Sequence, residues 1–421
     1  MLFIMMHEKM SSLDWPNLSS LHPPHHSTSL NIMTLKSLCA FALIALLSSC
    51  GGGNSSLKIP FTSLVTFGDS LSDVGTYKVG TIATLGGGKY TINSPTAQIW
   101  VEILASELSL AVPCAAQTGL NGSAAQGFNV PVTNHPGCTN YAQGGARVTH
   151  PVGPGNATLG GSNAMVGQLT VPVATQISNH LTLGGGFSGK ELVTVAAGAN
   201  DVFTQFSALS VLASDKPPFT TFSNYAQQVA MWSSADVTKV LTAGATGGAN
   251  AAAAAAAPIM AAQMSSAASS LVSLIKTQIL GKGANYVLVT NIPNISKSVA
   301  GTSLNNPALQ QMLDTITLAF NTTLQAGLAT TAGVKYEDVY AANTDQFLNP
   351  QLYGLSNVTT PACSLSAPAN VLASSLVCNS SNLVPGDVST YLLADSVHPT
   401  PFGHVLLVLD ATRNLVAAGW M

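Results

Sequence analysis

Three short segments of the chain are mostly apolar and rich in β-branched residues, and they constrain the fold more than any other feature. They are Phe61–Phe67 (FTSLVTF), Glu191–Ala196 (ELVTVA) and Asn285–Thr290 (NYVLVT). A strand with one solvated face alternates apolar and polar residues, whereas a strand of a parallel sheet is covered on both faces and shows no such alternation. The three segments therefore predict strands of a buried parallel sheet.

Amphipathic segments lie between and around these strands. Apolar residues recur at three- and four-residue steps, as in helices, over Ala97–Leu108, Met264–Leu280, Pro307–Leu328 and Phe402–Ala418. Alternating strands and helices predict an α/β fold, a doubly wound three-layer sandwich with a central parallel sheet. We expect one such domain over residues 60–421, with an Ala-rich insertion near residues 242–264.

Charge and metal-ligand spacing exclude several classes of protein. The chain has 14 Lys and Arg against 17 Asp and Glu, a net charge of −3, so it lacks the basic surplus that nucleic-acid binding requires. No C-x-x-C motif occurs, and His135, His150 and His404 are not spaced as metal ligands. We expect no metal, no cofactor and no nucleic-acid partner.

The amino-terminal region is typical of an exported protein. Residues 33–49 form a signal peptide, in which a lysine precedes a short apolar run, and the run ends at Leu-Ser-Ser before Cys50. This ending resembles a bacterial lipobox, which implies lipidation of Cys50, although an ordinary secretory signal is the alternative. Residues 50–59 would be a flexible tether, and residues 1–32 an untranslated or disordered extension. The expected location is the outer membrane, as a lipoprotein in contact with the membrane through its anchor, or the extracellular space.

The cysteine count agrees with export. Removing the two cysteines of the signal and the lipid site leaves an even set of four, which allows three disulfide connectivities. The pairing that closes the shortest loops joins Cys114 to Cys138 and Cys363 to Cys378. Such local staples are most useful in segments rich in Gly, Asn and Pro.

A candidate nucleophile and a candidate base lie near opposite ends of the chain. Ser70, in Gly-Asp-Ser-Leu-Ser-Asp, follows the first predicted strand, and a helix after it would point its amino-terminal dipole at the hydroxyl. Asp395 precedes His398 by three residues, a spacing that lets the carboxylate orient the imidazole as a base. Each motif alone also occurs in ordinary turns.

Two intervening segments supply the remaining parts of an ester-hydrolysing site. The loop Asn140–Ala146 (NYAQGGA) contains glycines whose backbone amides could approach an oxyanion closely. Asn200 follows the second predicted strand and offers a neutral amide donor at the same sheet edge. The four motifs together contain a nucleophile, oxyanion donors, a base and its orienting carboxylate.

These four blocks resemble the GDSL or SGNH hydrolase family over about residues 60–416, most closely its bacterial branch of extracellular esterases, lipases and lecithinase or hemolysin-type phospholipases. The resemblance implies a flavodoxin-like fold, with Ser70 as nucleophile, His398 as base and then acid, and Asp395 as the residue that orients it. It also implies an oxyanion hole formed by the backbone N–H groups of Ser70 and Gly145 and the side chain of Asn200. The choice of Gly145 over Gly144 depends on its offset from Asn140.

The expected function is therefore hydrolysis of small-molecule or lipid carboxylic esters through an acyl-enzyme. Two alternatives remain, a noncatalytic surface lipoprotein that binds lipid or glycan on this scaffold, and an acyltransferase. Gly184–Glu191 nearly matches a phosphate-binding loop, but Glu191 replaces the hydroxyl that would hold magnesium. Asp69, Asp73 and Asp201 are expected to hold loops rather than to act as acids or bases.

Overall fold

The computed structural model describes residues 58–421. The predicted extension at residues 1–32, the signal at residues 33–49, the lipid site at Cys50 and most of the tether lie outside the described residues.

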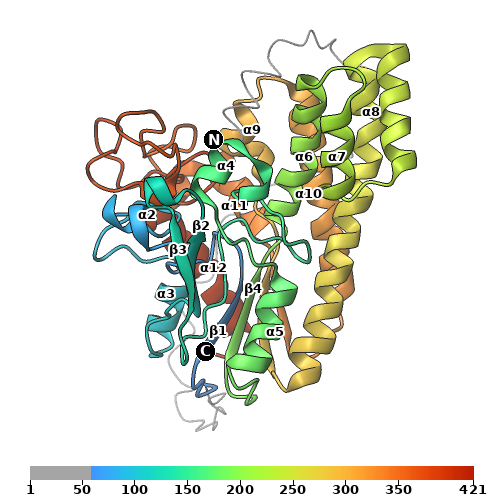
Figure 1. The fold of residues 1–421 in the computed structure, drawn as a ribbon. Helices are drawn as coiled ribbons and strands as arrows, with labels where there is room; N and C mark the ends of the chain where they lie inside the picture. The colour runs from blue at the N-terminus through green and yellow to red at the C-terminus, as the bar shows by residue number, and fades with distance from the viewer. Residues whose placement is uncertain (1–57) are drawn as a thin grey trace, which may run out of the picture.

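A four-stranded parallel sheet forms the centre of the molecule (Figure 1). Its strands are β1 (Leu64–Gly68), β4 (Leu192–Ala196), β5 (Tyr286–Thr290) and β6 (Val334–Glu337), paired in that order. The first three are the predicted strands, and all five residues of β1 and of β4 are buried. Strand β6 has only four residues, of which one is buried, so it lacks the apolar run by which the others could be recognised.

The chain is wound in both directions from β1. Asn140 forms a parallel bridge with Thr66 on the edge of β1 that faces away from β4. The connection from β1 therefore runs first to one side, and the later strands extend the sheet on the other side. This is the predicted doubly wound topology, in which ligands bind beyond the carboxyl ends of the strands where the winding direction reverses.

Helices cover both faces of the sheet. On one face, inward-pointing residues such as Phe67, Val195 and Val289 pack against helices α5 to α8 and α10. On the other face, Leu192 and Leu288 pack against α3 and α12. The two faces alternate along each strand because successive side chains point to opposite sides. The covering helices are α5 (Val173–Leu183), α6 (Ala199–Ser214), α7 (Thr220–Gln228), α8 (Ser234–Leu274), α10 (Pro307–Leu328), α3 (Trp100–Glu107) and α12 (Pro401–Ala417).

Helix α8 contains the Ala-rich segment and extends beyond the sheet (Figure 1). Its 41 residues include a non-helical Gly248 (φ 73°), which divides it into two helical parts. The helical stretch Ser234–Lys282 is long and apolar enough to cross a membrane by length and composition. Met260, Met264 and Leu271 of this stretch are fully buried in the core.

Smaller elements complete the rim around the carboxyl ends of the strands. A hairpin of β2 (Gln117–Asn121) and β3 (Asn129–Asn134) is stapled at its base by the Cys114–Cys138 disulfide. A second disulfide joins Cys363 to Cys378 within the long loop before α12. Both pairs are the ones that close the shortest loops. The remaining helices are α2 (Gly80–Thr84), α4 (Gly161–Val166), α9 (Val299–Thr302) and α11 (Val339–Leu348).

Candidate active site

Ser70 lies two residues beyond the end of β1. Gly68 makes this exit possible, because a Cβ at that position would be 2.3 Å from the carbonyl oxygen of Ala196 on the neighbouring strand. The side-chain amide of Gln176 holds the same glycine from the other side, accepting from its N–H and donating to its carbonyl, each at 2.8 Å. Ser70 is therefore fixed at the carboxyl edge of the sheet.

The helix expected directly after Ser70 is absent. The segment after Ser70 forms turns, and the next helix is α2, which begins at Gly80. The side chain of Asp73 explains the difference, since its carboxylate accepts hydrogen bonds from the backbone N–H groups of Gly75 (2.9 Å) and Thr76 (2.7 Å). Side chains that satisfy nearby backbone donors in this way compete with helix formation.

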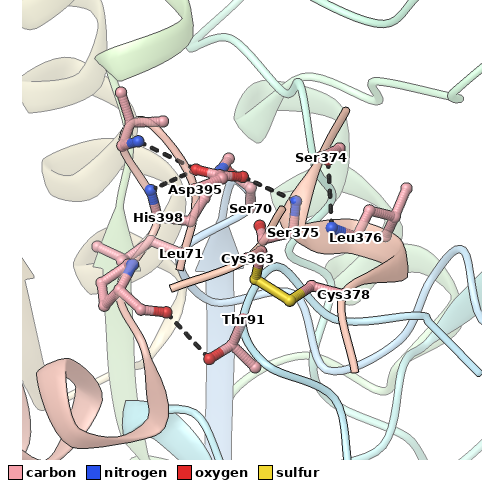
Figure 2. A network of polar contacts seen from close by, with 12 residues as sticks. Ser70, Leu71, Thr91, Cys363, Ser374, Ser375, Leu376, Cys378, Asp395 and His398 are labelled. Carbon is pink, nitrogen blue, oxygen red and sulfur yellow. Dashed lines mark hydrogen bonds and ion pairs between the residues drawn. A yellow bond between two sulfur atoms is a disulfide. The ribbon is translucent and has the colours of Figure 1, made fainter. Parts of the chain in front are cut away.

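Ser70, His398 and Asp395 form a continuous hydrogen-bonded chain. Figure 2 shows the three residues close together, with Ser375 on the other side of Asp395. The Ser70 hydroxyl lies 2.8 Å from Nε2 of His398, across 328 positions of sequence. Nδ1 of His398 lies 2.8 Å from Oδ2 of Asp395. With the proton assigned to Nδ1, the imidazole donates to the carboxylate and Nε2 accepts from the serine hydroxyl.

The carboxylate of Asp395 is buried but well supplied with donors. Besides His398, its oxygens accept hydrogen bonds from the backbone N–H groups of Ser375 (3.0 Å) and Val397 (3.0 Å). Burial raises the pKa of Asp395, but the interaction with His398 and the hydrogen bonds from His398 and Ser375 lower it by more, so the pKa lies well below its ordinary value. Asp395 is therefore ionised at neutral pH, as orienting the imidazole requires.

Three residues that carry N–H donors line the cavity beside the Ser70 hydroxyl. Ser70, Gly145 and Asn200 line the same cavity, and among the described residues neither the Ser70 nor the Gly145 backbone N–H has an acceptor. The side chain of Asn200 donates one hydrogen to the carbonyl of Ala146 (2.9 Å), which leaves its second hydrogen. Gly144, by contrast, donates its N–H to Asp73 Oδ2 (2.9 Å). The open donor in the glycine pair is therefore that of Gly145.

The neighbouring aspartates hold loops. Asp69 accepts from the N–H of Leu71 (3.1 Å), and Asp73 links the Ser70 turn to the glycine loop. Asp201 binds the guanidinium of Arg147 at 2.9 Å and the N–H of Val148 at 3.0 Å. Burial raises the pKa of Asp73 to about 6 despite its three backbone donors. The Arg147–Asp201 ion pair ties the glycine loop to α6.

Three further residues of the site, Tyr90, Ser375 and Gln176, were not predicted from the sequence. The ring of Tyr90 lies against the imidazole of His398, with ring centroids 4.8 Å apart and an interplanar angle of 35°. Ser375 supplies an N–H to Asp395, and Gln176 clamps Gly68. None of these belongs to a recognisable local pattern, so only the folded arrangement reveals them.

Two other histidines, His404 and His135, lie outside this hydrogen-bonded chain and make contacts within the fold. His404 is completely buried, its Nδ1 accepts from the N–H of Trp100 at 3.3 Å, and burial lowers its pKa to about 3. His135 contacts the hydroxyl of Thr118 at 2.8 Å, on the β2–β3 hairpin. Over residues 58–421, no group of three or more His, Cys, Asp or Glu could hold a metal ion.

Comparison with known proteins gives a family match over most of the chain. Residues 64–409 match the family described as GDSL-like Lipase/Acylhydrolase. No curated protein is significantly similar to the chain. Solved structures similar to this one include an extracellular lipase from Streptomyces rimosus, which is 13% identical with a TM-score of 0.40 over 84% of this chain and 99% of that chain.

Two further solved structures have comparable similarity. A phospholipase A1 from Streptomyces albidoflavus NA297 is 14% identical with a TM-score of 0.38, over 84% of this chain and 99% of that one. An acetylxylan esterase from Geobacillus stearothermophilus is 11% identical with a TM-score of 0.36, over 84% of this chain and 94% of that one.

Proposed function

Because the chain belongs to the GDSL-like lipase/acylhydrolase family and is accordingly an ester-bond hydrolase, we propose that it cleaves carboxylic esters through an acyl-enzyme formed on Ser70. The observation that carries this proposal is the 2.8 Å contact between the Ser70 hydroxyl and Nε2 of His398. A serine hydroxyl is a weak nucleophile unless a base accepts its proton during attack.

The reaction proceeds in two halves. His398 takes the Ser70 proton as Oγ attacks the ester carbonyl, and Asp395 stabilises the imidazolium that results. The tetrahedral intermediate then collapses, the C–O bond to the alcohol breaks, and His398 returns the proton to the leaving oxygen. In the second half His398 deprotonates a water, which attacks the acyl-enzyme and releases the carboxylic acid and free Ser70.

The developing oxyanion would lie between the backbone N–H groups of Ser70 and Gly145 and the side chain of Asn200. Unpaired donors fixed in this way stabilise charge that forms only in the transition state, so they raise kcat rather than ground-state binding. The glycine at position 145 is required, because a Cβ there would lie 2.1 Å from the carbonyl oxygen of Pro154 and its φ is +79°.

Substitution of the nucleophile tests this proposal. Ser70→Ala should abolish hydrolysis of a p-nitrophenyl ester panel from acetate to palmitate and should also abolish labelling by a fluorophosphonate probe. Full activity in the purified variant would refute the assignment. A wild-type protein that folds but neither turns over esters nor reacts with the probe would instead be a noncatalytic binding protein. Product analysis with glycerol as acceptor separates hydrolysis from acyl transfer.

We further propose that the protein is exported and anchored through a lipid on Cys50. Two disulfides support an oxidising compartment, since such bonds are rare in the cytosol. Radiolabelled palmitate should be incorporated into the wild-type protein expressed in a bacterial host, and Cys50→Ala should abolish the incorporation. Absence of label from the wild-type protein would end the proposal.

A further inference from the structure

Two cavities adjoin Ser70. Both are lined by Ser70, Phe203, Val397 and His398, so the two cavities meet at the reacting atoms. We call them the apolar chamber and the polar chamber, because polar side chains make up a larger share of the lining in the second. A substrate ester bound at Ser70 has two arms, one on the acyl side and one on the alcohol side of its carbonyl carbon.

The apolar chamber lies between the carboxyl ends of β4 and β5 and helices α11 and α12. Its walls include Ala197, Ile292, Phe347, Leu393 and Leu407, and polar side chains such as Asn291 and Asp410 make up a smaller share. Apolar residues bind a hydrocarbon chain by removing apolar surface from water, at about 25 cal/mol per Å². A chain of methylene groups therefore suits this chamber.

The polar chamber contains the oxyanion donors and several neutral polar side chains. Besides Gly145 and Asn200, it is lined by Ser162, Asn163, Gln168 and Ser374, which lie next to apolar residues such as Met165 and Leu372. Hydroxyl and amide groups can both donate and accept hydrogen bonds, so they match a partner that carries hydroxyl groups. The chamber therefore suits an uncharged, hydroxyl-bearing group.

Among the described residues, the polar chamber has no lysine or arginine that could balance the charge of a bound anion. The ionised Asp395, by contrast, is one of its walls. Nearby cations are already paired, Arg147 with Asp201 and Lys89 with Glu102, each at 2.9 Å. Desolvating a phosphate without a cationic partner is costly, and repulsion from Asp395 adds to the cost.

Building on the proposed function of Ser70, we propose that the substrates are neutral amphiphilic esters. The apolar chamber binds the acyl chain, and the polar chamber binds an uncharged polyol such as glycerol or a sugar. Phosphate-bearing lipids are poor substrates, because their charged group would enter a chamber that offers no cation.

A matched pair of substrates tests the headgroup. 1-Octanoylglycerol and 1-octanoylglycerol 3-phosphate differ only in the phosphate, so the ratio of their kcat/KM values isolates its charge and size. With both substrates below their critical micelle concentrations, the neutral ester should be hydrolysed with a kcat/KM at least tenfold higher. A ratio below ten overturns the proposal.

A charge-adding variant separates charge from size. Asn163→Lys places a cation in the polar chamber and should raise kcat/KM for the phosphate ester at least threefold. Ala164→Lys, at the adjacent exposed residue, which does not line the chamber, adds the same charge to the protein and should leave that value within a factor of 1.5. Equal effects of the two variants would overturn the assignment of the polar chamber.

A bulk-adding variant tests the apolar chamber. Ala342 on α11 lines it, whereas the adjacent Ala341 is exposed and does not. Ala342→Phe should lower kcat/KM for p-nitrophenyl octanoate at least tenfold and leave that for the acetate within twofold, whereas Ala341→Phe should change neither. Equal losses on both esters would place the acyl chain elsewhere.

These results are distinguishable from failure of the proposed function. If no ester is hydrolysed in a manner that depends on Ser70, the proposed function fails. If Ser70-dependent hydrolysis is present but indifferent to the phosphate, or insensitive to bulk at position 342, only the inference about the two chambers fails.

Discussion

At the scale of single residues, the side-chain amide of Asn200 has two N–H hydrogens, of which only one is used within the described part of the protein. One is donated to the carbonyl of Ala146 at 2.9 Å, and the other would be donated to the proposed oxyanion. We predict that Asn200→Ala lowers kcat by about 10²-fold with little change in KM, because the lost donor acts mainly in the transition state. Steady-state kinetics would show this, with thermal unfolding as the control for folding. A loss of less than threefold would exclude Asn200 from the oxyanion hole.

Tyr90 offers a second residue-scale prediction, because its ring covers His398 at 4.8 Å while its buried hydroxyl has no hydrogen-bond partner among the described residues. Burial raises the pKa of this hydroxyl well above its ordinary value, so the hydroxyl stays protonated. The ring therefore carries the contact with the base. We predict that Tyr90→Phe keeps kcat within twofold of wild type.

Removal of the ring should have a larger effect. Tyr90→Leu should lower kcat at least fivefold with KM within twofold, because an imidazole without its aromatic neighbour samples orientations in which Nε2 no longer faces Ser70. Recovery of kcat in the Phe variant but not in the Leu variant distinguishes positioning of the base from hydrogen bonding by the hydroxyl. Equal losses in both variants would contradict this role.

The predicted site residues were accessible from sequence because each lies in a short block with its own chemistry. Ser70 and Asn200 follow apolar strands, and Asp395 precedes His398 by three residues. Tyr90 and Gln176 have no such signal, since each contributes through a partner more than a hundred positions away. The contact that distinguishes Gly144 from Gly145, a hydrogen bond to Asp73, is likewise a product of folding.

At the scale of elements, the prediction succeeded where burial imposes a pattern. Strands β1, β4 and β5 are almost entirely buried, and α10 has the bounds predicted for it, Pro307–Leu328, with Asn306 as its cap. The prediction of a helix after Ser70 was wrong. The Asp73 carboxylate accepts the backbone N–H groups of Gly75 and Thr76 there and holds the segment as a turn. Local propensity does not reveal which of these competing hydrogen bonds forms.

The Cys363–Cys378 disulfide closes a loop that contacts Asp395, the hydrogen-bond partner of His398. Its loop presents the N–H of Ser375 to Asp395, and Asn93 further binds the carbonyl of Cys378 at 3.0 Å. We predict that the double variant Cys363→Ser, Cys378→Ser loses about 3 kcal/mol of unfolding free energy, as expected for a loop of 15 residues, and that its kcat falls at least fivefold.

The other disulfide provides the matched control. Cys114–Cys138 closes a loop with a separation of 24 residues at the base of the β2–β3 hairpin, so its removal should cost a similar unfolding free energy. Because no residue within that loop contacts Asp395 or His398 through an identified hydrogen bond, the fall in kcat should be smaller. Urea unfolding and steady-state kinetics on the two double variants test this. Equal losses of kcat would mean that the first disulfide contributes stability alone.

At the scale of the whole molecule, parallel strands and the long loop before α12 bring the sequence blocks of the site together. His398 follows the long loop before α12 rather than a strand, and that loop brings it to Ser70 across 328 positions. Ser70 and Asn200 follow β1 and β4, and the carboxyl ends of these parallel strands lie at one edge of the sheet, so the two residues converge there. This convergence was predictable from the alternation of strands and helices. The shapes of the two chambers were not, because they depend on how α11, α12 and the loop before α12 pack over that edge.

The pH dependence of the unfolding free energy tests whether the buried carboxyl group of Asp69, at the edge of the sheet, is protonated in the folded protein. Asp69 is only 4% exposed, and burial raises its pKa from 3.8 to about 7, although the N–H of Leu71 and the interaction with His398 oppose the shift. The folded protein therefore retains a proton that the unfolded chain releases above about pH 4. This contribution to stability is fully present below pH 3.8 and is lost as the pH rises through about 7.

Asp69→Asn should remove this dependence, because the amide keeps an acceptor for Leu71 and does not ionise. The unfolding free energy of the variant, minus that of the wild type, should increase between pH 4 and pH 7, by at most about 4 kcal/mol at 1.36 kcal/mol per pKa unit. Asp73, whose pKa is raised to about 6, has the same sign but is present in both proteins, so its contribution cancels in the difference. Urea unfolding at intervals of half a pH unit would measure the difference. A flat difference over this range would mean that water or a donor reaches the Asp69 carboxylate and keeps it ionised at the edge of the sheet.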